Sequence, residues 1–570
     1  QCERGVATVM DRAKQGAWLF LLACGAAACS AGSPVPDRPA PIAWADTLPI
    51  AEPDDRDVNE VPRIIVTALS GEMSKVLGFR AIAGRHREAL NVDHFDDVPS
   101  SAWFVHRNGS SRMTPEQVFA GPTTSDGPAA GPLTIVAAKV EGISPGYTVR
   151  DAAGDRYVVK FDPKGFLYLS SGAGVISNRL LHAAGFNVPE DYIFTFSTDR
   201  LEVDPDATVT GDDFIERPLT LQVARDALDR TDPLPDGRYV AVASKFVPGP
   251  PKGPFFFKGV RKDDPNDHYR HEGRRELRGL YVVSAWINHV DMRFMNTMDA
   301  YVSPGFLRHY LIDFAATLGS GTIRPHEPRE GLEYNFDLWD TLARMFSFGF
   351  HRAGWEGVDF EPIHPTIGWL AAEDFDPSQW KANWPNAAFS AMTDRDAYWG
   401  AKLVGSFDEE QIRAAVAAGR LPDAWAADTL TTILVLRRDR IVRHWYSRVS
   451  PIENLKVILT RDAPDMLDFD DYGIRDGAWT LEGTRYRWRF EDPVTGVSAG
   501  GVNGPPFPNQ YRQGVFIREL EGRWSRAPAT GGPYARVEIT VERNGKAAPR
   551  PATVYLRWVG DRYEVVGLEH

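Results

Sequence analysis

Residues 284–316 read SAWINHVDMRFMNTMDAYVSPGFLRHYLIDFAA, and this stretch combines a polar loop with two runs of apolar residues. An apolar run that can close a helix leads into Asn288-His289-Val290-Asp291, and Asn296 follows five residues after Asp291. Two runs typical of strands, 297–303 and 306–314, then flank Pro304-Gly305. The pattern predicts a helix that leads through a polar loop into a β-hairpin.

The predicted hairpin brings an amide and a carboxylate together. If the turn is centred between Pro304 and Gly305, the residue opposite Asn296 is Asp313, because both lie equally far from that centre. Opposed residues hold their Cβ atoms about 4.5–5.5 Å apart, so the two side chains could share one hard cation. Pro followed by Gly suits a type II turn better than the primed turns of tight hairpins, so the register could slip by one residue.

Upstream, residues 133–161 predict three short antiparallel strands joined by glycine-containing links. Lys160 lies inside the third strand, in the sequence Val-Val-Lys-Phe. The link from Gly142 to Gly146 could present backbone N–H groups to an anion. An edge lysine facing solvent is the alternative role for Lys160, since side chains alternate between the two faces of a strand.

The next segments predict a helix over 172–184 that ends at Gly185, an acidic loop over 203–213, and a strand over 238–249 that ends in a Pro/Gly link. A further helix then leads to Asp291.

The order of these elements carries a resemblance. A lysine strand, a helix, a link, His-x-Asp-x-x-x-x-Asn and Asp-Phe together resemble the catalytic and metal-binding segments of the protein-kinase-like superfamily. Leu-x-x-Ala-Ala-Gly-Phe-Asn-Val-Pro after the lysine strand is similar to HipA-type and CotH-type atypical kinases. Trp-Ile-Asn-His-Val-Asp and Tyr-Leu-Ile-Asp-Phe-Ala are similar to segments of uncharacterised bacterial exported lipoproteins. The resemblance covers about residues 133–320 and implies an α+β fold with a two-lobed kinase-like core.

The resemblance also implies a role for each residue of the motifs. Asp291, with His289 beside it, would be catalytic and would orient or deprotonate an acceptor hydroxyl. Asn296 and Asp313 would hold Mg or Mn, which bridges the phosphates of ATP or another nucleotide. The residues implied to contact those phosphates are Lys160, Ser144, Gly146 and Arg293.

Two positions depart from the family pattern. No Asp or Glu lies between Asp162 and Glu190, so the helix over 172–184 offers only Gly174 near the place where a carboxylate should meet Lys160. Lys160 would then need a more distant partner, such as Glu141 or Glu190, or would have none. Ala315 stands where Gly is usual after Asp-Phe, and alanine accepts fewer backbone conformations.

The N-terminus predicts export. Arg12 and Lys14 precede an apolar run from Ala17 to Ala23 that is too short to span a bilayer and is typical of a signal segment. Leu-Leu-Ala-Cys24 resembles a bacterial lipobox, with Cys29 as the alternative site of lipidation. An uncleaved apolar anchor is the other interpretation. We therefore expect a lipid-anchored protein of the cell envelope, at the outer membrane, that contacts the membrane only through this anchor.

The C-terminal part predicts helices over 333–450 and short alternating strands over 456–570, as in a small β-sandwich-like domain. The basic cluster Arg437, Arg438, Arg440 and Arg443 is typical of the solvated face of a helix. The predicted organisation is a signal segment (1–29), a tether (30–61), an N-terminal extension with a small β-rich lobe (62–245), a helical large lobe (246–455) and the β domain (456–570).

Composition limits the possible partners. A net charge of −13 at pH 7 argues against a nucleic-acid partner, which needs a basic face.

The expected function is metal-dependent transfer of phosphoryl from a nucleotide to a protein or envelope glycan acceptor. The alternative is a catalytically inactive pseudokinase that acts as an envelope scaffold or binding module. A polysaccharide-modifying enzyme is a third possibility, but no paired carboxylates at suitable spacing support it.

Overall fold

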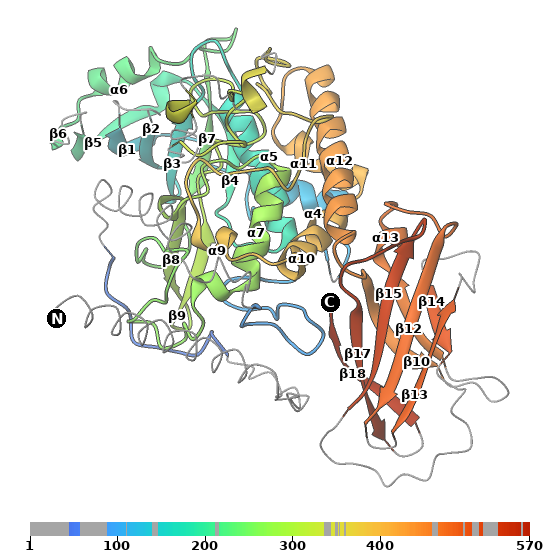
Figure 1. Cartoon of the computed structure of the whole chain (residues 1–570). Coiled ribbons are helices and arrows are strands. Elements are labelled where there is room, and N and C mark those ends of the chain that lie inside the picture. The colour runs from blue at the N-terminus through green and yellow to red at the C-terminus, as the bar shows by residue number, and fades with distance from the viewer. Residues whose placement is uncertain are drawn as a thin grey trace, which may run out of the picture.

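The protein is an α+β molecule in this computed structural model, with a large mixed sheet, a helical region, a hairpin and a C-terminal pair of sheets (Figure 1). The structure describes residues 45–56, 88–109, 111–139, 146–210, 216–335, 344–347, 352, 354–357, 361–458, 466–493, 496–503, 512–516, 534–559 and 562–570. The predicted lipidation sites Cys24 and Cys29, the loop residue Ser144 and the possible partner Glu141 lie outside these residues.

A seven-stranded sheet has the order β4-β7-β3-β2-β1-β5-β6. The predicted meander over 133–161 is confirmed, because β1, β2 and β3 pair antiparallel in sequence order. The predicted loop over 203–213 is wrong for its described part, since residues 201–210 form β5, which pairs in parallel with β1. The strands are β1 (Leu133–Lys139), β2 (Gly146–Arg150), β3 (Arg156–Phe161), β4 (Asp191–Phe196), β5 (Leu201–Thr210), β6 (Glu216–Pro218) and β7 (Tyr239–Lys245).

Helix α5 (Leu169–Ala184) lies between the sheet and the helical region (Figure 1). It ends as predicted at Gly185, whose φ of 116° is accessible to glycine at little cost. The helix begins three residues earlier than predicted, because the buried carboxylate of Asp162 accepts hydrogen bonds from the backbone N–H and hydroxyl groups of Ser170 and Ser171. These bonds satisfy N–H groups that the first turn of a helix leaves free.

Helix α7 (Arg275–Trp286) is held at its C-terminus by α12 (Ala424–Tyr446). The guanidinium of Arg437, on α12, donates hydrogen bonds to the carbonyl oxygens of Ala285, Trp286 and Ala371. Arg437 is only 2% exposed, so its predicted place on a solvated face is wrong. Burial lowers the pKa of Arg437 to about 9. A cation at this end of α7 also interacts favourably with the helix dipole.

The hairpin consists of β8 (Thr297–Val302) and β9 (Phe306–Leu311). Its register pairs Thr297 with Leu311, and the backbone N–H of Ile312 donates to the carbonyl of Asn296. Asn296 therefore lies opposite Ile312, and the predicted opposition to Asp313 is wrong by one residue. The turn is centred on Pro304 alone. This is the one-residue shift in register that the Pro-Gly sequence allowed.

Part of the predicted tether is docked on this hairpin. Within the described segment 45–56, the backbone of Ile50 bonds Gly305 and accepts from the Tyr301 hydroxyl. Lys252 is paired with Glu52 and Asp55. These contacts make residues 45–56 part of the folded body, in contrast to the extended linker expected from their composition.

Helices α9 and α10 pack against α7, whereas α6 lies against β5 of the large sheet and α13 lies in the C-terminal region (Figure 1). Predicted capping of the helix after Asp408 is confirmed, with reciprocal bonds between Asp408 and Gln411. No helix in the described ranges is both long and apolar enough to cross a bilayer. The helices are α4 (Pro115–Ala120), α6 (Leu221–Leu228), α9 (Ala387–Ser390), α10 (Asp394–Gly405), α11 (Glu409–Ala418) and α13 (Tyr472–Arg475), with short 3₁₀ turns at Thr198–Arg200, His271–Gly273, Phe294–Asn296 and Gly354–Gly357.

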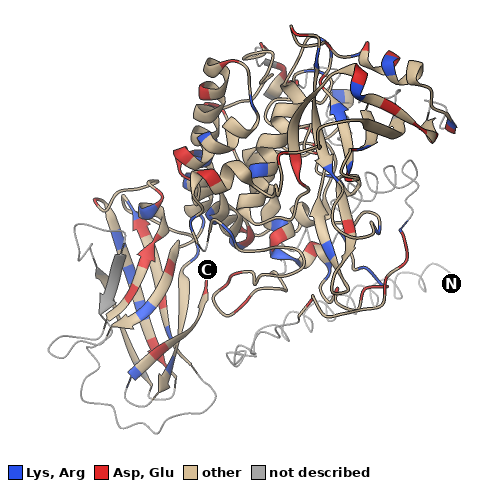
Figure 2. Ribbon diagram, turned by 180° about the vertical axis from the view of Figure 1, so that it is seen from behind, with Lys and Arg blue, Asp and Glu red and all other residues tan. Residues whose placement is uncertain are grey.

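The C-terminal region forms two sheets, β10-β11-β14 and β13-β12-β15-β17-β18, with β16 paired to β15. Apolar side chains from both sheets, such as Phe469 and Val537, share one buried cluster. Charges of both signs lie along the strands of this region (Figure 2), and Arg487 and Arg489 pair with glutamates of β15. The strands are β10 (Ile452–Ile458), β11 (Met466–Asp471), β12 (Thr484–Asp492), β13 (Val497–Asn503), β14 (Arg512–Phe516), β15 (Ala535–Arg543), β16 (Lys546–Ala547), β17 (Ala552–Val559) and β18 (Arg562–Glu569).

A buried charge network joins this region to the helices. Asp96 is 2% exposed, and its carboxylate accepts from Arg275 Nη1 at 2.6 Å and from Arg395 Nη2 at 2.7 Å. The backbone N–H of the last residue, His570, also donates to Asp96 at 3.2 Å. Burial alone would raise the pKa of Asp96, but Arg275, His570 and Arg395 hold it well below its ordinary value. One carboxylate thus links α7, α10 and the C-terminus.

Replacing Asp96 by Ala should destabilise the protein by about 3–5 kcal/mol, because two buried arginines lose their shared partner. Urea unfolding followed by circular dichroism measures this change. Asp204→Ala is the matched control, since its pair with Arg150 lies at the surface and should contribute less than about 1 kcal/mol. Equal effects of the two substitutions would contradict the assignment.

Candidate functional site

A cavity of about 300 Å³ lies between the seven-stranded sheet, α5 and the β8–β9 hairpin. Its walls are mainly apolar, and the polar groups that line it include Lys160, Asp191, Asn296 and Asp313. This size is at the lower end of the range of small-molecule pockets, which combine apolar walls with a few placed polar groups. The apolar lining comes from Val158, Val242, Phe246, Val247, Met295, Met298, Ile312 and Phe314.

Lys160 and Asp313 form an ion pair across this cavity, with 2.7 Å between Nζ and Oδ2. Lys160 comes from β3, and Asp313 follows the end of β9 with a φ of 61°, which is uncommon for a residue other than glycine. Burial would raise the pKa of Asp313, but the charge and hydrogen bond of Lys160 bring that pKa below its ordinary value. The lysine therefore turns into the cavity, and the solvated edge position considered from the sequence is wrong.

Asp291 and Asn296 are joined directly. The side-chain N–H of Asn296 donates to the backbone oxygen of Asp291 at 2.7 Å and to its Oδ2 at 2.9 Å. Arg293 lies 3.0 Å from the other carboxylate oxygen of Asp291. Because the amide nitrogen of Asn296 faces Asp291, its amide oxygen is the atom left to face a cation. Burial raises the pKa of Asp291, and the charge of Arg293 opposes that rise.

His289 lies beneath the site and does not line it. It is 1% exposed, and its ring stands edge-on to Phe314 with 5.8 Å between ring centroids. Burial lowers the pKa of His289 to about 4, so the imidazole is neutral at pH 7. The predicted catalytic role of His289 therefore has no surface through which to act on a substrate. Its position instead supports Phe314 and the turn after Asp313.

The other residues that the sequence predicted at the site differ in where the structure places them. Gly146 is the first residue of β2 and lies opposite Lys160 in the register, where an added Cβ would lie 2.5 Å from the carbonyl oxygen of Val159. Ser144 lies outside the described residues. Glu190, considered as a partner of Lys160, instead accepts hydrogen bonds from Thr124 and Tyr192. Gly174 lines the same cavity as Lys160 and faces the turn at Phe314, and it brings no carboxylate there.

Asp191 is the site residue that sequence reasoning missed. It is 5% exposed at the start of β4, it lines the cavity, and its Oδ1 has no hydrogen-bond partner in the described structure. Burial raises the pKa of Asp191 to about 6, against smaller opposing effects of Ser244, Arg179 and Lys160. The only feature of the sequence that pointed to Asp191 was its position as an acid at the start of an apolar strand. The neighbouring Glu190 was considered as the partner of Lys160 instead.

The link after β7 borders the same cavity. Phe246 and Val247 line it, and within the described chain the backbone N–H and C=O of Val247 make no hydrogen bond to protein groups. Within the described chain, the link therefore offers a backbone donor and acceptor to a ligand in the cavity, as backbone groups do in many ligand sites.

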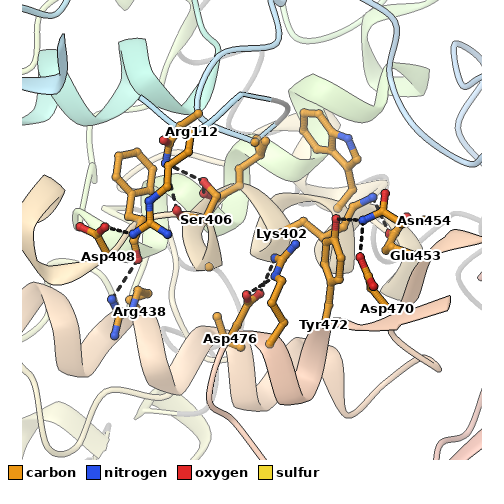
Figure 3. Close-up of a pocket in the computed structure, with 18 of the residues that line it drawn as sticks. Arg112, Lys402, Ser406, Asp408, Arg438, Glu453, Asn454, Asp470, Tyr472 and Asp476 are labelled. Atoms are coloured by element: carbon orange, nitrogen blue, oxygen red, sulfur yellow. Dashed lines mark hydrogen bonds and ion pairs between the residues drawn. The ribbon is translucent and has the colours of Figure 1, made fainter. Parts of the chain in front are cut away.

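A second, larger cavity of about 930 Å³ lies between α10, α12 and the C-terminal region (Figure 3). Its charged residues point toward one another, as with Lys402 and Glu453 at 2.7 Å and Arg112 with Asp408. Asn454 donates to Asp470 at 2.7 Å. Because these charges already neutralise one another, we assign this cavity to the seam between the C-terminal region and the helices.

Two residues of the first cavity offer oxygen donors to a metal ion. The described residues contain no group of three or more His, Cys, Asp or Glu that could hold an ion. Asn296 and Asp313 nevertheless offer one amide and one ionised carboxylate, the hard oxygen donors that Mg²⁺ prefers when nucleotide phosphates and water supply its other ligands. Both residues line the same cavity, so their donor types suit a metal that arrives with a nucleotide.

Comparison with known proteins provides no relative, since no protein-family model, no curated protein and no solved structure matches the chain.

Replacing Asp191 by Asn should stabilise the protein at pH 7.5 by on the order of 2–3 kcal/mol, because the fold no longer has to hold a poorly partnered charge. The pKa of Asp191 is higher in the folded chain, at about 6, than its ordinary value of 3.8. The cost therefore grows as pH rises from about 4 to 6 and is constant above. Urea unfolding of both proteins between pH 4 and 8 measures the difference.

Glu190→Gln is the control for this prediction, since Glu190 is partnered and should show no such pH-dependent difference. A destabilised Asp191→Asn protein at pH 7.5, or a gain that is the same at pH 4, would contradict the assigned state of Asp191.

Proposed function

We propose that the protein is a metal-dependent phosphotransferase with a two-lobed kinase-like core that transfers phosphoryl from ATP or another nucleotide to a protein or envelope glycan. The observation that carries the proposal is the convergence of Lys160, Asp313 and the bonded pair Asp291–Asn296 around one cavity. These groups come from β3, from the chain after β9, and from the loop after α7. Their order along the chain is that of the kinase-like superfamily.

The cavity supports binding of a nucleotide in one orientation. The base would lie between Val158 and Met298, with its edge at the backbone of Val247. The phosphates would then extend toward Lys160 and Asp313, which form an ion pair in the same cavity. A compact ammonium such as Lys160 is a common phosphate ligand.

Mg²⁺ or Mn²⁺, held by Asn296 and Asp313, would neutralise charge on the phosphates when bound. Asp291 would hold the acceptor hydroxyl and take its proton as the oxygen attacks the γ-phosphorus. One P–O bond then forms, the bond to the β-phosphate oxygen breaks, and the nucleoside diphosphate leaves. The raised pKa of Asp291 suits a base, because a stronger base accepts the proton more readily.

A second candidate function is a catalytically inactive module at the cell envelope. Two observations favour it: α5 carries no carboxylate, and the two acids needed for chemistry are already paired, Asp313 with Lys160 and Asp291 with Arg293. The C-terminal region, joined to the helices through Asp96, would then present a rigid surface to envelope partners. In either case we propose export and lipid anchoring at Cys24 or Cys29, which follows from the lipobox-like sequence.

Nucleotide binding tests the proposal first. ATP with MgCl₂ at millimolar concentration should raise the thermal midpoint of the full chain by several degrees, as ligands specific to the folded state do. Asp313→Ala should abolish the part of this shift that depends on Mg²⁺. Asp470→Ala is the matched control, since Asp470 lines the other cavity and should leave the shift unchanged. No shift with any nucleotide at millimolar concentration would contradict the proposal.

Phosphoryl transfer distinguishes the two candidate functions. Asp291→Ala should keep nucleotide binding but lower the rate of γ-phosphoryl transfer to acceptors in an envelope extract by roughly 10²–10⁴-fold. Labelled nucleotide followed by gel or thin-layer separation measures that rate. Binding without transfer, together with an unchanged cellular phenotype of Asp291→Ala and Asp313→Ala, would favour the inactive module.

A further inference from the structure

This inference rests on the proposed function, under which Lys160 loses its present ion-pair partner. Its present partner is Asp313, at 2.7 Å. If Asp313 binds a divalent ion, its carboxylate must turn its charge toward that ion. The phosphates would then supply charge to the ammonium, but they would not fix the position of a flexible lysine side chain that is 31% exposed. A second carboxylate on the cavity wall would hold Lys160 in place over the phosphates.

Helix α5 does not supply this carboxylate. It contains no Asp or Glu along residues Leu169–Ala184. Its residues on the cavity wall are Ser170 and Gly174. The anion must therefore come from another element of the cavity wall.

The register of the sheet places Asp191 on the same face as Lys160. Lys160 pairs with Val242 on one side of β7, and Asp191 pairs with Ser244 on the other. Val242 and Ser244 are two residues apart, so their side chains and those of their partners project to the same face. Both Lys160 and Asp191 accordingly line the cavity. They are separated by one strand and offset by two residues, and both belong to the wall of the same cavity.

The state of Asp191 shows that it is available. One carboxylate oxygen is held by the Ser244 hydroxyl, while Oδ1 has no hydrogen-bond partner in the described structure. Arg179 donates to the backbone oxygen of Asp191. After burial, the charges that act on the pKa of Asp191 include Lys160, which lowers it, and Asp313, which raises it. The three charges therefore interact across the cavity.

We propose that Asp191 is the positioning carboxylate for Lys160, and that it takes over the lysine from Asp313 when the nucleotide and its metal ion bind. Asp191 does not touch the transferred phosphoryl group. It acts through Lys160, by holding the ammonium at the phosphates, and it does so from β4. In the free protein, the buried charge of Asp191 lowers the stability of the fold, and the carboxylate stays available to bind Lys160.

An alternative role for Asp191 is recognition of the base, because a carboxylate can accept from the amino group of a purine. That role predicts a loss that differs between adenine and guanine nucleotides. A role as the partner of Lys160 predicts the same loss of affinity for adenine and guanine nucleotides, because Lys160 acts at the phosphates. The test is designed around this difference.

The first experiment measures dissociation constants of MgATP and MgGTP for the full chain by titration calorimetry. Asp191→Asn should weaken both nucleotides by a similar factor of about tenfold, the size of a coupling between two charged groups. Glu190→Gln, the neighbouring acid that faces Thr124 and Tyr192, should bind like the wild type. The stability expected of Asp191→Asn ensures that a loss of binding is not a loss of folding.

The second experiment is a double-mutant cycle with Lys160→Met. If Asp191 acts through the lysine, Asp191→Asn should have less than a twofold effect in the Lys160→Met protein, which keeps residual binding through the base and metal. A purely structural role, or a contact with the base, would leave the tenfold loss in place and would overturn the inference. Wild-type affinity in Asp191→Asn, or a loss confined to one base, would overturn it as well.

Failure of the proposed function has a different outcome. In that case the wild-type chain itself binds neither MgATP nor MgGTP at millimolar concentration, before any substitution is compared. Binding by the wild type together with an uncoupled Asp191 would retain the proposed function and reject only this inference.

Discussion

The ion pair between Lys160 and Asp313 is the interaction on which the arrangement of the site depends. It joins β3 of the large sheet to the chain that leaves β9, two elements that share no strand pairing. The cavity exists because these elements face each other, with α5 behind them. Asp313 adopts a φ of 61° there, and such backbone conformations persist only where surrounding contacts maintain them.

The surrounding contacts are buried polar bonds. Arg437 binds the last carbonyl groups of α7 and so holds the loop that carries Asp291 and Asn296. Thr317 donates to the carbonyl of Phe314 and accepts from Ser177 on α5, which ties the turn after Asp313 to that helix. Each bond satisfies a group that would be costly to bury alone. The site is therefore built on elements that are fixed from behind.

The C-terminal region shares this dependence on buried charge. Asp96 holds Arg275 and Arg395 together and reaches the C-terminal His570, so the β-sheets are part of the same folded unit as α7 and α10. The mutually paired charges of the larger cavity lie along that seam (Figure 3). Asp191 differs from the carboxylates of these networks, because one of its oxygens is buried without a partner in the described structure. That contrast is why it stands out as a functional group.

The sequence by itself determined the local elements: the meander with Lys160, the helix ending at Gly185, the capped helix after Asp408, and the hairpin before Asp313. These follow from strand alternation, capping and turn residues, which act over a few positions. Only the tertiary structure decided the one-residue register of the hairpin, the burial of Arg437 and His289, and the place of Asp191. Those features depend on which surfaces meet, and contacts between residues such as Arg437 and Ala285, 152 positions apart, leave no local pattern.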